Sequence, residues 1–483
     1  LDDATSAEIF NMLGENNGYA NMSKSGARGS KSNLLQAFAY KGRVKKNSYE
    51  SFNALIENSY KDQVTPMEHF VDAFGGRQGQ MDKSLKTGDT GYAMRQMWHA
   101  TQGMYITTKD CGTREGLVVS KEFLVQLAET PDSSSEAAQQ QVKKEVASMF
   151  KHAIVGRYKV GSSKTITAAE AEEWANDDSI DSIEIRSPLR CKNPCCSRCY
   201  GIDWSTRKVA QPGFVAGITA AQSIGEPGAQ LTLKQFQKGG VAGKAEFNSA
   251  FDKVNAYIHV QDLGAQSKKG TYSGYDPVAW ETGRIIEQPS SDISMKVVTI
   301  EGSSRKLLVP KTVLLKEYAT KGLGLSYRHG DYSIPEMLNI CSLAEAQRYL
   351  AFKLYYLYKS EVEIAMVHFE TLVASMTRYM IVSTDRNDLM VGQYCTQQEL
   401  FSGSVANTIY VPRLLSVTEL LQASNEALDA IQMENQAQGL SRICLLELTD
   451  TLTKPINRMV LGLTIEQGSA VPGFIEERKE KIR

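Results

Sequence analysis

Residues 211–243 constrain the fold of this chain more than any other stretch, because they place helix-compatible sequence between clusters of helix breakers. Residues 214–224 are mostly small, so a helix there would let another backbone approach closely. The Gly-Glu-Pro-Gly sequence at 225–228 predicts a break in that helix. Residues 229–238 suit about three more helical turns and end at a glycine pair. A segment with breakers at both ends is typical of a lid that folds as a unit; an exposed amphipathic helix is the alternative.

Four residues of this segment, Gln230, Leu233, Lys234 and Gln237, share one face of the predicted helix because they follow the spacing i, i+3, i+4, i+7. The sequence of residues 220–236, AAQSIGEPGAQLTLKQF, resembles the trigger loop of the beta-prime subunit of multisubunit RNA polymerases. The resemblance implies that Leu233 caps the incoming base, that Lys234 and Gln237 face the phosphates, and that Gln230 approaches the sugar. Bacterial members of that family usually have histidine where this chain has Gln237. Glutamine donates a hydrogen bond but supplies no proton at neutral pH.

A second helix is predicted from Pro66 to about Thr101, because Thr65 and Glu68 have the spacing of a capping box around a proline at the first helical position. Such a helix would be roughly 50 Å long at about 1.5 Å per residue. Its five glycines each cost up to about 1 kcal/mol in a helix interior, so two shorter helices around a glycine joint are the alternative. An apolar stripe should anchor the helix, formed by Phe70, Phe74, Met81, Leu85 and Tyr92.

The same helix resembles the polymerase bridge helix at residues 74–79, FGGRQG, and 85–92, LKTGDTGY. The resemblance implies that Thr87 and Gly88 face the templating base and the incoming nucleotide. Cations on several sides of a rod suit nucleic acid passing across it. Residues 25–30, SGARGS, resemble the loop that precedes the bridge helix and braces the active site. The predicted nucleic-acid-binding residues are Arg28, Arg77, Lys86, Tyr92 and Arg95.

Four of the eight cysteines lie within nine residues of one another, and this clustering indicates metal binding in an intracellular chain. Cys196 and Cys199 form a Cys-x-x-Cys knuckle, and Cys191 precedes it. Residues 107–116, TTKDCGTREG, resemble the segment that supplies the first zinc ligand in the polymerase subunit and contain Cys111. These four thiolates predict a closed, structural Zn²⁺ site. Cys195 is the alternative to Cys196, and unliganded thiols are the alternative to a metal site.

The remaining sequence gives coarser expectations. At 483 residues the chain has room for two to four domains of about 150 residues each. A formal net charge of −1 excludes a uniformly basic nucleic-acid coat, and no apolar run approaches the ~18 residues of a membrane span. The chain reads as soluble and intracellular; its start at Leu1 fits a longer precursor, processing or trimming equally well.

The predicted fold class is α+β and multidomain, and the resemblance implies the beta-prime C-terminal part of a polymerase built around double-psi β-barrels. Alternating glycine, serine and β-branched runs predict a small β-rich module before a mainly helical end, and the resemblance implies a jaw-like insertion at that place. The predicted regions are 1–62 at the active-site rim, 63–104 for the bridge helix, 105–210 for zinc binding, 211–260 for the trigger-loop hairpin, 261–340 for the β-rich insertion and 341–483 for the helical C-terminal region.

The sequence contains no Asp-Phe-Asp-Gly-Asp motif, the family's holder of the two catalytic Mg²⁺ ions. The resemblance therefore implies a split subunit, as in giant (jumbo) bacteriophages, whose partner chain carries the aspartates and holds Mg²⁺. Expected partners are beta-like chains, the N-terminal beta-prime-like chain, the DNA template, the RNA product and nucleoside triphosphates, in the host cytoplasm or packaged in a virion. Two alternatives stay open: a scaffold subunit without a catalytic role, and a zinc-dependent nucleic-acid-binding protein that works alone.

Overall fold

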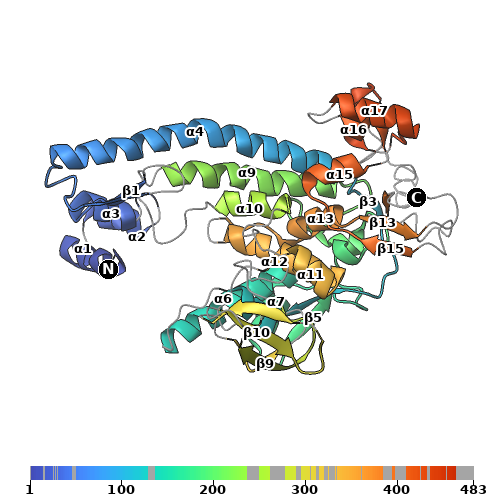
Figure 1. Ribbon diagram of the computed structural model, residues 1–483, viewed down its shortest axis with the longest axis horizontal. Coiled ribbons are helices and arrows are strands. Elements are labelled where there is room, and N and C mark those ends of the chain that lie inside the picture. The colour runs from blue at the N-terminus through green and yellow to red at the C-terminus, as the bar shows by residue number, and fades with distance from the viewer. Residues whose placement is uncertain are drawn as a thin grey trace, which may run out of the picture. The chain divides into compact units, whose positions relative to one another are not determined.

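The structure is a computed structural model and divides into two compact units, Leu1–Ala93 with Gly225–Lys253, and Met94–Ile224 with Val254–Arg483. Its mixture of helices and small sheets confirms the predicted α+β class (Figure 1). The residues that it describes are 2–14, 17–25, 27, 29, 31–45, 51–128, 136–236, 250–260, 278–289, 295–304, 306–311, 315–319, 325, 332, 334–359, 362–384, 394–396, 409–424, 426–431, 436–452 and 454–463.

The first unit holds short helices, a hairpin and most of a long helix. Ile9 packs with Leu34 and Leu35 in one apolar cluster, and Val44 and Ile56 pack with Val71 in another. The second cluster fixes the hairpin against the start of the long helix, because its first two members lie on the paired strands β1 and β2. The elements are α1 (Asp2–Leu13), α2 (Gly18–Lys24), α3 (Lys31–Phe38), β1 (Gly42–Lys45), β2 (Ser51–Ile56) and α4 (Pro66–Thr101), the last of which continues into the second unit.

Helix α4 is continuous, so the predicted long helix is confirmed and the alternative of two shorter helices is wrong. The capping box is present, because the Thr65 amide and hydroxyl donate to Glu68 Oε2 at 2.9 and 2.8 Å and the Glu68 amide donates to Thr65 Oγ1 at 3.3 Å. Phe74 of the apolar stripe packs against Phe52 of β2, with ring centres 5.3 Å apart, so within the described residues the stripe anchors the helix only in part. Four of its five side chains are between 37% and 64% exposed. The buried apolar side chains of the helix include Val71, Ala93 and Met97, which lie roughly 70° to 150° around it from the stripe.

Helix α9 (Ala216–Phe236) is also continuous, so the predicted break at 225–228 is wrong. A proline within a helix removes one backbone hydrogen bond and costs about 3 kcal/mol. Gly225, Pro227 and Gly228 are buried, and the small face of the first turns is buried as well. Packing of this face offsets the local cost, since burial of apolar surface is favourable wherever it occurs along a helix. The glycine pair that follows lies outside the described residues.

The second unit is built on packed helices with small sheets around them. Strands β9 (Gly283–Pro289), β10 (Met295–Ile300), β11 (Leu307–Pro310) and β12 (Tyr318–Ala319) form one antiparallel sheet in the order β11-β10-β9-β12. Its core includes Trp280 and Val298. A three-stranded sheet has the order β14-β13-β15. The helix α13 is almost entirely buried and packs against α12. Among the described residues, no helix combines the length and the apolar character that crossing a membrane requires.

The elements of the second unit before the β-rich sheet are β3 (Ile106–Thr108), β4 (Leu117–Ser120), α5 (Lys121–Leu127), α6 (Glu136–Ile154), α7 (Ala168–Asn176), β5 (Ser182–Ile185), η1 (Pro188–Arg190), β6 (Cys195–Cys196), α8 (Ser197–Tyr200), β7 (Ile202–Asp203) and β8 (Lys208–Val209). Those that follow α9 are α10 (Ala250–Ile258), which begins in the first unit, β9 (Gly283–Pro289), β10 (Met295–Ile300), β11 (Leu307–Pro310), β12 (Tyr318–Ala319), α11 (Ile334–Ile340), α12 (Leu343–Lys359), α13 (Met366–Met376), β13 (Tyr379–Thr384), β14 (Tyr394–Thr396), β15 (Ile409–Pro412), α15 (Val417–Ala423), α16 (Ala427–Ile431), α17 (Gln436–Leu446) and α18 (Pro455–Val460).

Candidate four-cysteine site and the roots of the two long helices

The structure brings together the sulfur atoms of the four predicted metal ligands. The Sγ atoms of Cys111, Cys191, Cys196 and Cys199 all lie within 4.8 Å of one another, and those of Cys111 and Cys199 are 3.7 Å apart. A tetrahedral zinc ion with sulfur bonds of about 2.3 Å separates its sulfurs by about 3.8 Å. The spacing and the sulfur-only donor set are therefore compatible with a closed zinc site. All eight cysteines are free of disulfides.

Strand pairing decides which of the two adjacent cysteines joins the group. Strand β6 pairs in parallel with β3, with Cys195 opposite Ile106 and Cys196 opposite Thr108. Neighbouring strand residues point to opposite faces, so Cys195 turns into the apolar cluster of Ile106 while Cys196 turns to the other sulfurs. Burial raises the pKa of the Cys195 thiol, which disfavours a thiolate at that position.

Two short segments hold the four cysteine sulfurs in place. Cys196 caps helix α8, and its sulfur accepts a hydrogen bond from the Cys199 amide at 3.4 Å. On the other side, the Arg198 amide donates to the Lys109 carbonyl at 3.1 Å, which ties the knuckle to the segment carrying Cys111. Both contacts involve backbone amides, so the backbone conformation helps to fix the positions of the sulfurs.

A buried cation lies directly against the sulfurs. Arg186 follows strand β5, is 6% exposed, and donates from Nε to Cys199 Sγ and from Nη2 to Cys111 Sγ, each at 3.4 Å. Its Nη2 also binds Asp110 Oδ1 at 2.7 Å. Asp110 in turn accepts from Arg198 Nη1 at 2.9 Å. The sulfurs therefore share their surroundings with two guanidinium groups and one carboxylate.

A second buried ion pair joins this module to helix α13. Arg157 and Glu370 are 3% and 0% exposed and meet through two hydrogen bonds of 2.8 and 2.6 Å. The same guanidinium donates to the carbonyl oxygens of Arg186 and Cys199 at 2.8 and 3.2 Å, and Ser187 Oγ donates to Glu370 at 2.5 Å. The fork geometry of arginine suits such a junction, because one planar group satisfies two carboxylate oxygens and two carbonyls.

The C-terminal end of α4 and the N-terminal end of α9 contact each other inside the second unit, and we call these two ends the roots of the helices. The Thr101 hydroxyl donates to the Gly217 carbonyl at 2.9 Å, and the Gly217 amide donates to the Met104 carbonyl at 2.7 Å. Helix α13 supports the same turn, because Ser375 Oγ donates to the Ala100 carbonyl at 2.6 Å. The Ala100 carbonyl at the end of α4 and the Gly217 amide at the start of α9 are groups that helix ends leave without intrahelical partners, and these bonds satisfy both.

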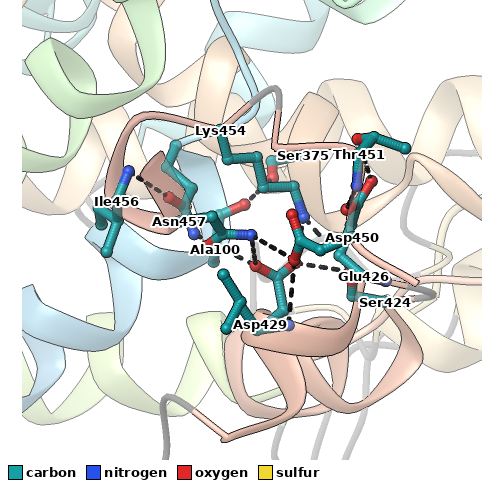
Figure 2. Close-up of polar contacts among 12 residues, drawn as sticks. Ala100, Ser375, Ser424, Glu426, Asp429, Asp450, Thr451, Lys454, Ile456 and Asn457 are labelled. Atoms are coloured by element: carbon teal, nitrogen blue, oxygen red, sulfur yellow. Dashed lines mark hydrogen bonds and ion pairs between the residues drawn. The ribbon is translucent and has the colours of Figure 1, made fainter. Parts of the chain in front are cut away.

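A polar cluster of the C-terminal region also holds this end of α4 (Figure 2). Asp429, 2% exposed, pairs with Lys454 and accepts from Ser424 Oγ at 2.6 Å. Gln102, directly after α4, donates to Asp429 at 3.4 Å and accepts from the Ile456 amide at 3.2 Å. The buried carboxylate therefore has both a cation and several hydrogen-bond donors, as a buried charge requires.

Comparison with known proteins identifies the family. A family model described as RNA polymerase Rpb1, domain 5 matches residues 64–397, more than half of the chain. The chain belongs to this family. The beta' subunit of DNA-directed RNA polymerase from Thermus thermophilus is 28% identical over 470 residues, covering 93% of this chain and 30% of that protein. The beta' subunit from Bacillus subtilis is 26% identical over 498 residues, covering 99% of this chain and 40% of that protein. The chain thus spans less than half the length of these relatives.

Several predicted site residues of this Rpb1 domain 5 chain lie on the exposed side of α4. Thr87, Gly88 and Arg95 are exposed, Tyr92 is 37% exposed, and Arg77 is exposed with its guanidinium 5.8 Å from the centre of the Phe74 ring. Their roles stay predictions. For Lys86 on α4, and for Gln230, Leu233 and Lys234 on α9, the structure describes the backbone but not the side chain; Arg28 and Gln237 lie outside the described residues.

Sequence reasoning missed the charged residues around the sulfurs of this Rpb1 domain 5 member. Arg186, Asp110, Arg157 and Glu370 come from four separate segments. The available signal was Asp110 beside Cys111 and an arginine five residues before Cys191. Neither signal shows which way a side chain points, because that depends on pairings between distant strands.

Proposed function

We propose that this chain supplies the bridge helix and the trigger loop of a multisubunit DNA-directed RNA polymerase, a nucleotidyltransferase. The observation that carries the proposal is the family match over residues 64–397, which contains both α4 and α9. The curated relatives that match nearly the whole chain have the name beta' subunit of DNA-directed RNA polymerase. In this proposal the chain acts as one part of the polymerase, together with its other subunits.

In this proposal α4 is the bridge helix. Thr87 and Gly88 face the templating base and the incoming nucleotide, and the exposed cations Arg77 and Arg95 contact the phosphates of the template or of the product. Lys86, Tyr92 and Arg28 belong to the same nucleic-acid surface. The exposed side chains at Phe70, Met81 and Leu85 support the idea, because several large apolar side chains exposed along one face of a helix are typical of a contact with another molecule.

The end of α9 and the residues that follow it form the trigger loop. Leu233 caps the base, Lys234 and Gln237 face the phosphates, and Gln230 approaches the sugar. Closure orders the reactants and excludes water, and the rate enhancement would come from that positioning. The buried Gly225, Pro227 and Gly228 support the proposal. Glycine and proline have low helix propensity, so this part of α9 depends on packing for its helical conformation.

Two kinds of metal ion belong to the proposal. Zn²⁺ held by Cys111, Cys191, Cys196 and Cys199 is structural, since four sulfurs leave no open position for catalysis. In the proposed split-subunit arrangement, aspartates of a partner chain hold the catalytic Mg²⁺. The partners are beta-like chains, an N-terminal beta-prime-like chain, DNA, RNA and nucleoside triphosphates. The arrangement is the split-subunit type of giant bacteriophages, working in the host cytoplasm or packaged in a virion.

Purification of the complex tests the proposal. An affinity-tagged chain should co-purify with a beta-like chain and with a chain that carries an aspartate cluster, and the complex should extend a primed RNA–DNA scaffold by one nucleotide. Deletion of residues 230–237 should remove most of that activity. Full activity after the deletion would favour a scaffold role, and salt-sensitive nucleic-acid binding by the chain alone, without partners, would favour a stand-alone binding protein.

A further inference from the structure

One arginine of the four-cysteine site contacts the sulfurs themselves. Arg186 Nη2 lies 3.4 Å from Cys111 Sγ, 3.4 Å from Cys199 Sγ and 3.9 Å from Cys196 Sγ, while its Nε lies 3.4 Å from Cys199 Sγ. Three of the four sulfurs thus share one guanidinium. Two nitrogens of the group, Nε and Nη2, take part, so the guanidinium fork, and not only its charge, is directed at the cluster.

The position of Arg186 has a cause in the fold. It is the first residue after strand β5, whose Ile183 and Ile185 are buried against β4. Its carbonyl accepts from Arg157 at 2.8 Å, and its amide donates to the Tyr158 carbonyl at 2.7 Å. Asp110 Oδ1 binds Nη2 of the same guanidinium at 2.7 Å. The backbone and the head group of Arg186 are therefore both fixed.

The charge of the metal site favours a cation beside the sulfurs. Four thiolates around a divalent ion carry a net charge of about −2, and a buried net charge is costly unless it is paired or hydrogen-bonded. Hydrogen bonds to a ligating sulfur also withdraw electron density that would otherwise attract a proton or an electrophile. A lysine at this position would supply charge but not the planar fork that reaches several sulfurs at once.

We propose that Arg186 is a positioning residue of the four-cysteine site: its N–H groups bind the ligand sulfurs and slow the escape of the metal ion. This inference rests on the proposed zinc site. It assigns to Arg186 a role distinct from that of the four ligands, because the arginine acts through the sulfurs and touches no metal. Asp110 has the secondary role of orienting the guanidinium.

The test measures zinc release from the full chain, purified with any subunits that accompany it. Zinc content is measured by atomic emission, and release to a chromogenic chelator is followed in time. Arg186→Gln should lose zinc about 10 to 100 times faster than the wild type, the scale on which outer contacts of metal ligands act. Arg186→Lys should release zinc at a rate between those of the wild type and Arg186→Gln. Arg198→Gln is the matched control, since Arg198 binds Asp110 but, among the described contacts, no sulfur.

A spectroscopic readout separates a direct sulfur contact from a general loss of stability. With Co²⁺ in place of Zn²⁺, the sulfur-to-cobalt charge-transfer band should shift in Arg186→Gln and Arg186→Lys but not in Arg198→Gln. If Arg186→Gln does not fold, Arg186→Lys carries the test. Zinc-loaded Arg186 variants with the wild-type release rate and band would overturn the role of Arg186 alone. A wild-type chain without zinc would overturn the metal site as well.

Discussion

Gly217 lies so close to Thr101 that a Cβ atom on the glycine would sit 1.9 Å from the Thr101 carbonyl oxygen. Atoms that are not bonded do not approach to such a distance, so a glycine is required for the roots of α4 and α9 to touch backbone to backbone. The Thr101 hydroxyl, which also donates to the Met97 carbonyl at 2.8 Å, completes the contact.

Gly217→Ala should destabilise the second unit by at least about 1–3 kcal/mol, because the neighbouring group is backbone and cannot turn away. Urea unfolding of the full chain measures this change. Gly76→Ala is the control: the position is helical, and an added Cβ meets nothing within 4 Å. That variant should keep or raise stability, by up to about 1 kcal/mol. Equal stability of the two variants would contradict the described contact.

Gly88→Ala separates folding from function. An added Cβ at Gly88 meets nothing within 4 Å inside this chain, and alanine favours a helix by up to about 1 kcal/mol over glycine. Folding should therefore be unharmed. If Gly88 faces the templating base, a methyl group there displaces the reacting nucleotide, and single-nucleotide addition should slow by about 100-fold. Gly76→Ala should keep the wild-type rate; a normal rate for Gly88→Ala would remove Gly88 from the nucleotide site.

Lys234→Ala should slow nucleotide addition about 10- to 1000-fold, the scale expected for loss of a positioned charged contact to the transition state. Gln237→His should leave a working enzyme, since histidine also donates a hydrogen bond to phosphate. Rapid-quench measurement of one addition step on an assembled scaffold checks both. An unchanged rate in Lys234→Ala would defeat the role assigned to that lysine.

Asp429→Ala should destabilise the C-terminal region by about 3–5 kcal/mol, because it leaves the ammonium of Lys454 without its buried partner. The double variant Asp429→Leu with Lys454→Met should recover part of this loss, since it removes both charges. Lys143→Ala is the control: its pair with Asp178 is 68% and 75% exposed, and loss of such a pair changes stability by about 0–1 kcal/mol. Thermal unfolding at several salt concentrations compares the three.

Glu68 gives the start of α4 a dependence on pH. Hydrogen bonds from the Asn58 side chain and from Thr65 lower the pKa of Glu68 from 4.5 to about 2. A lowered carboxyl pKa adds stability that is complete above 4.5 and is lost as the pH falls toward 2. The difference in free energy of unfolding between wild type and Glu68→Gln should therefore shrink as the pH falls below 4.5. A difference that stays constant through that range would contradict the capping role.

Local rules predicted local features well. The capping box at Thr65 and Glu68 lies within four residues and was readable from the sequence, as was the helix that it begins. The break expected at Pro227 was wrong, because a local rule does not count the burial of Gly225 and Gly228. The choice between Cys195 and Cys196 needed the pairing of β6 with β3, two segments far apart in the sequence. Arg186 escaped prediction for the same reason, since only the fold brings it to the sulfurs.

The four-cysteine site has a mechanical consequence for the two long helices. Cys111 follows α4 by way of β3, and Cys199 precedes α9 by way of β7 and β8, so the sulfur cluster lies between the two helix roots along the chain. Because Thr101 and Gly217 bind the two roots to each other, one end of each helix is fixed. Movement further along either helix then requires bending or unwinding of the helix itself, and not rotation of the whole helix about its fixed end.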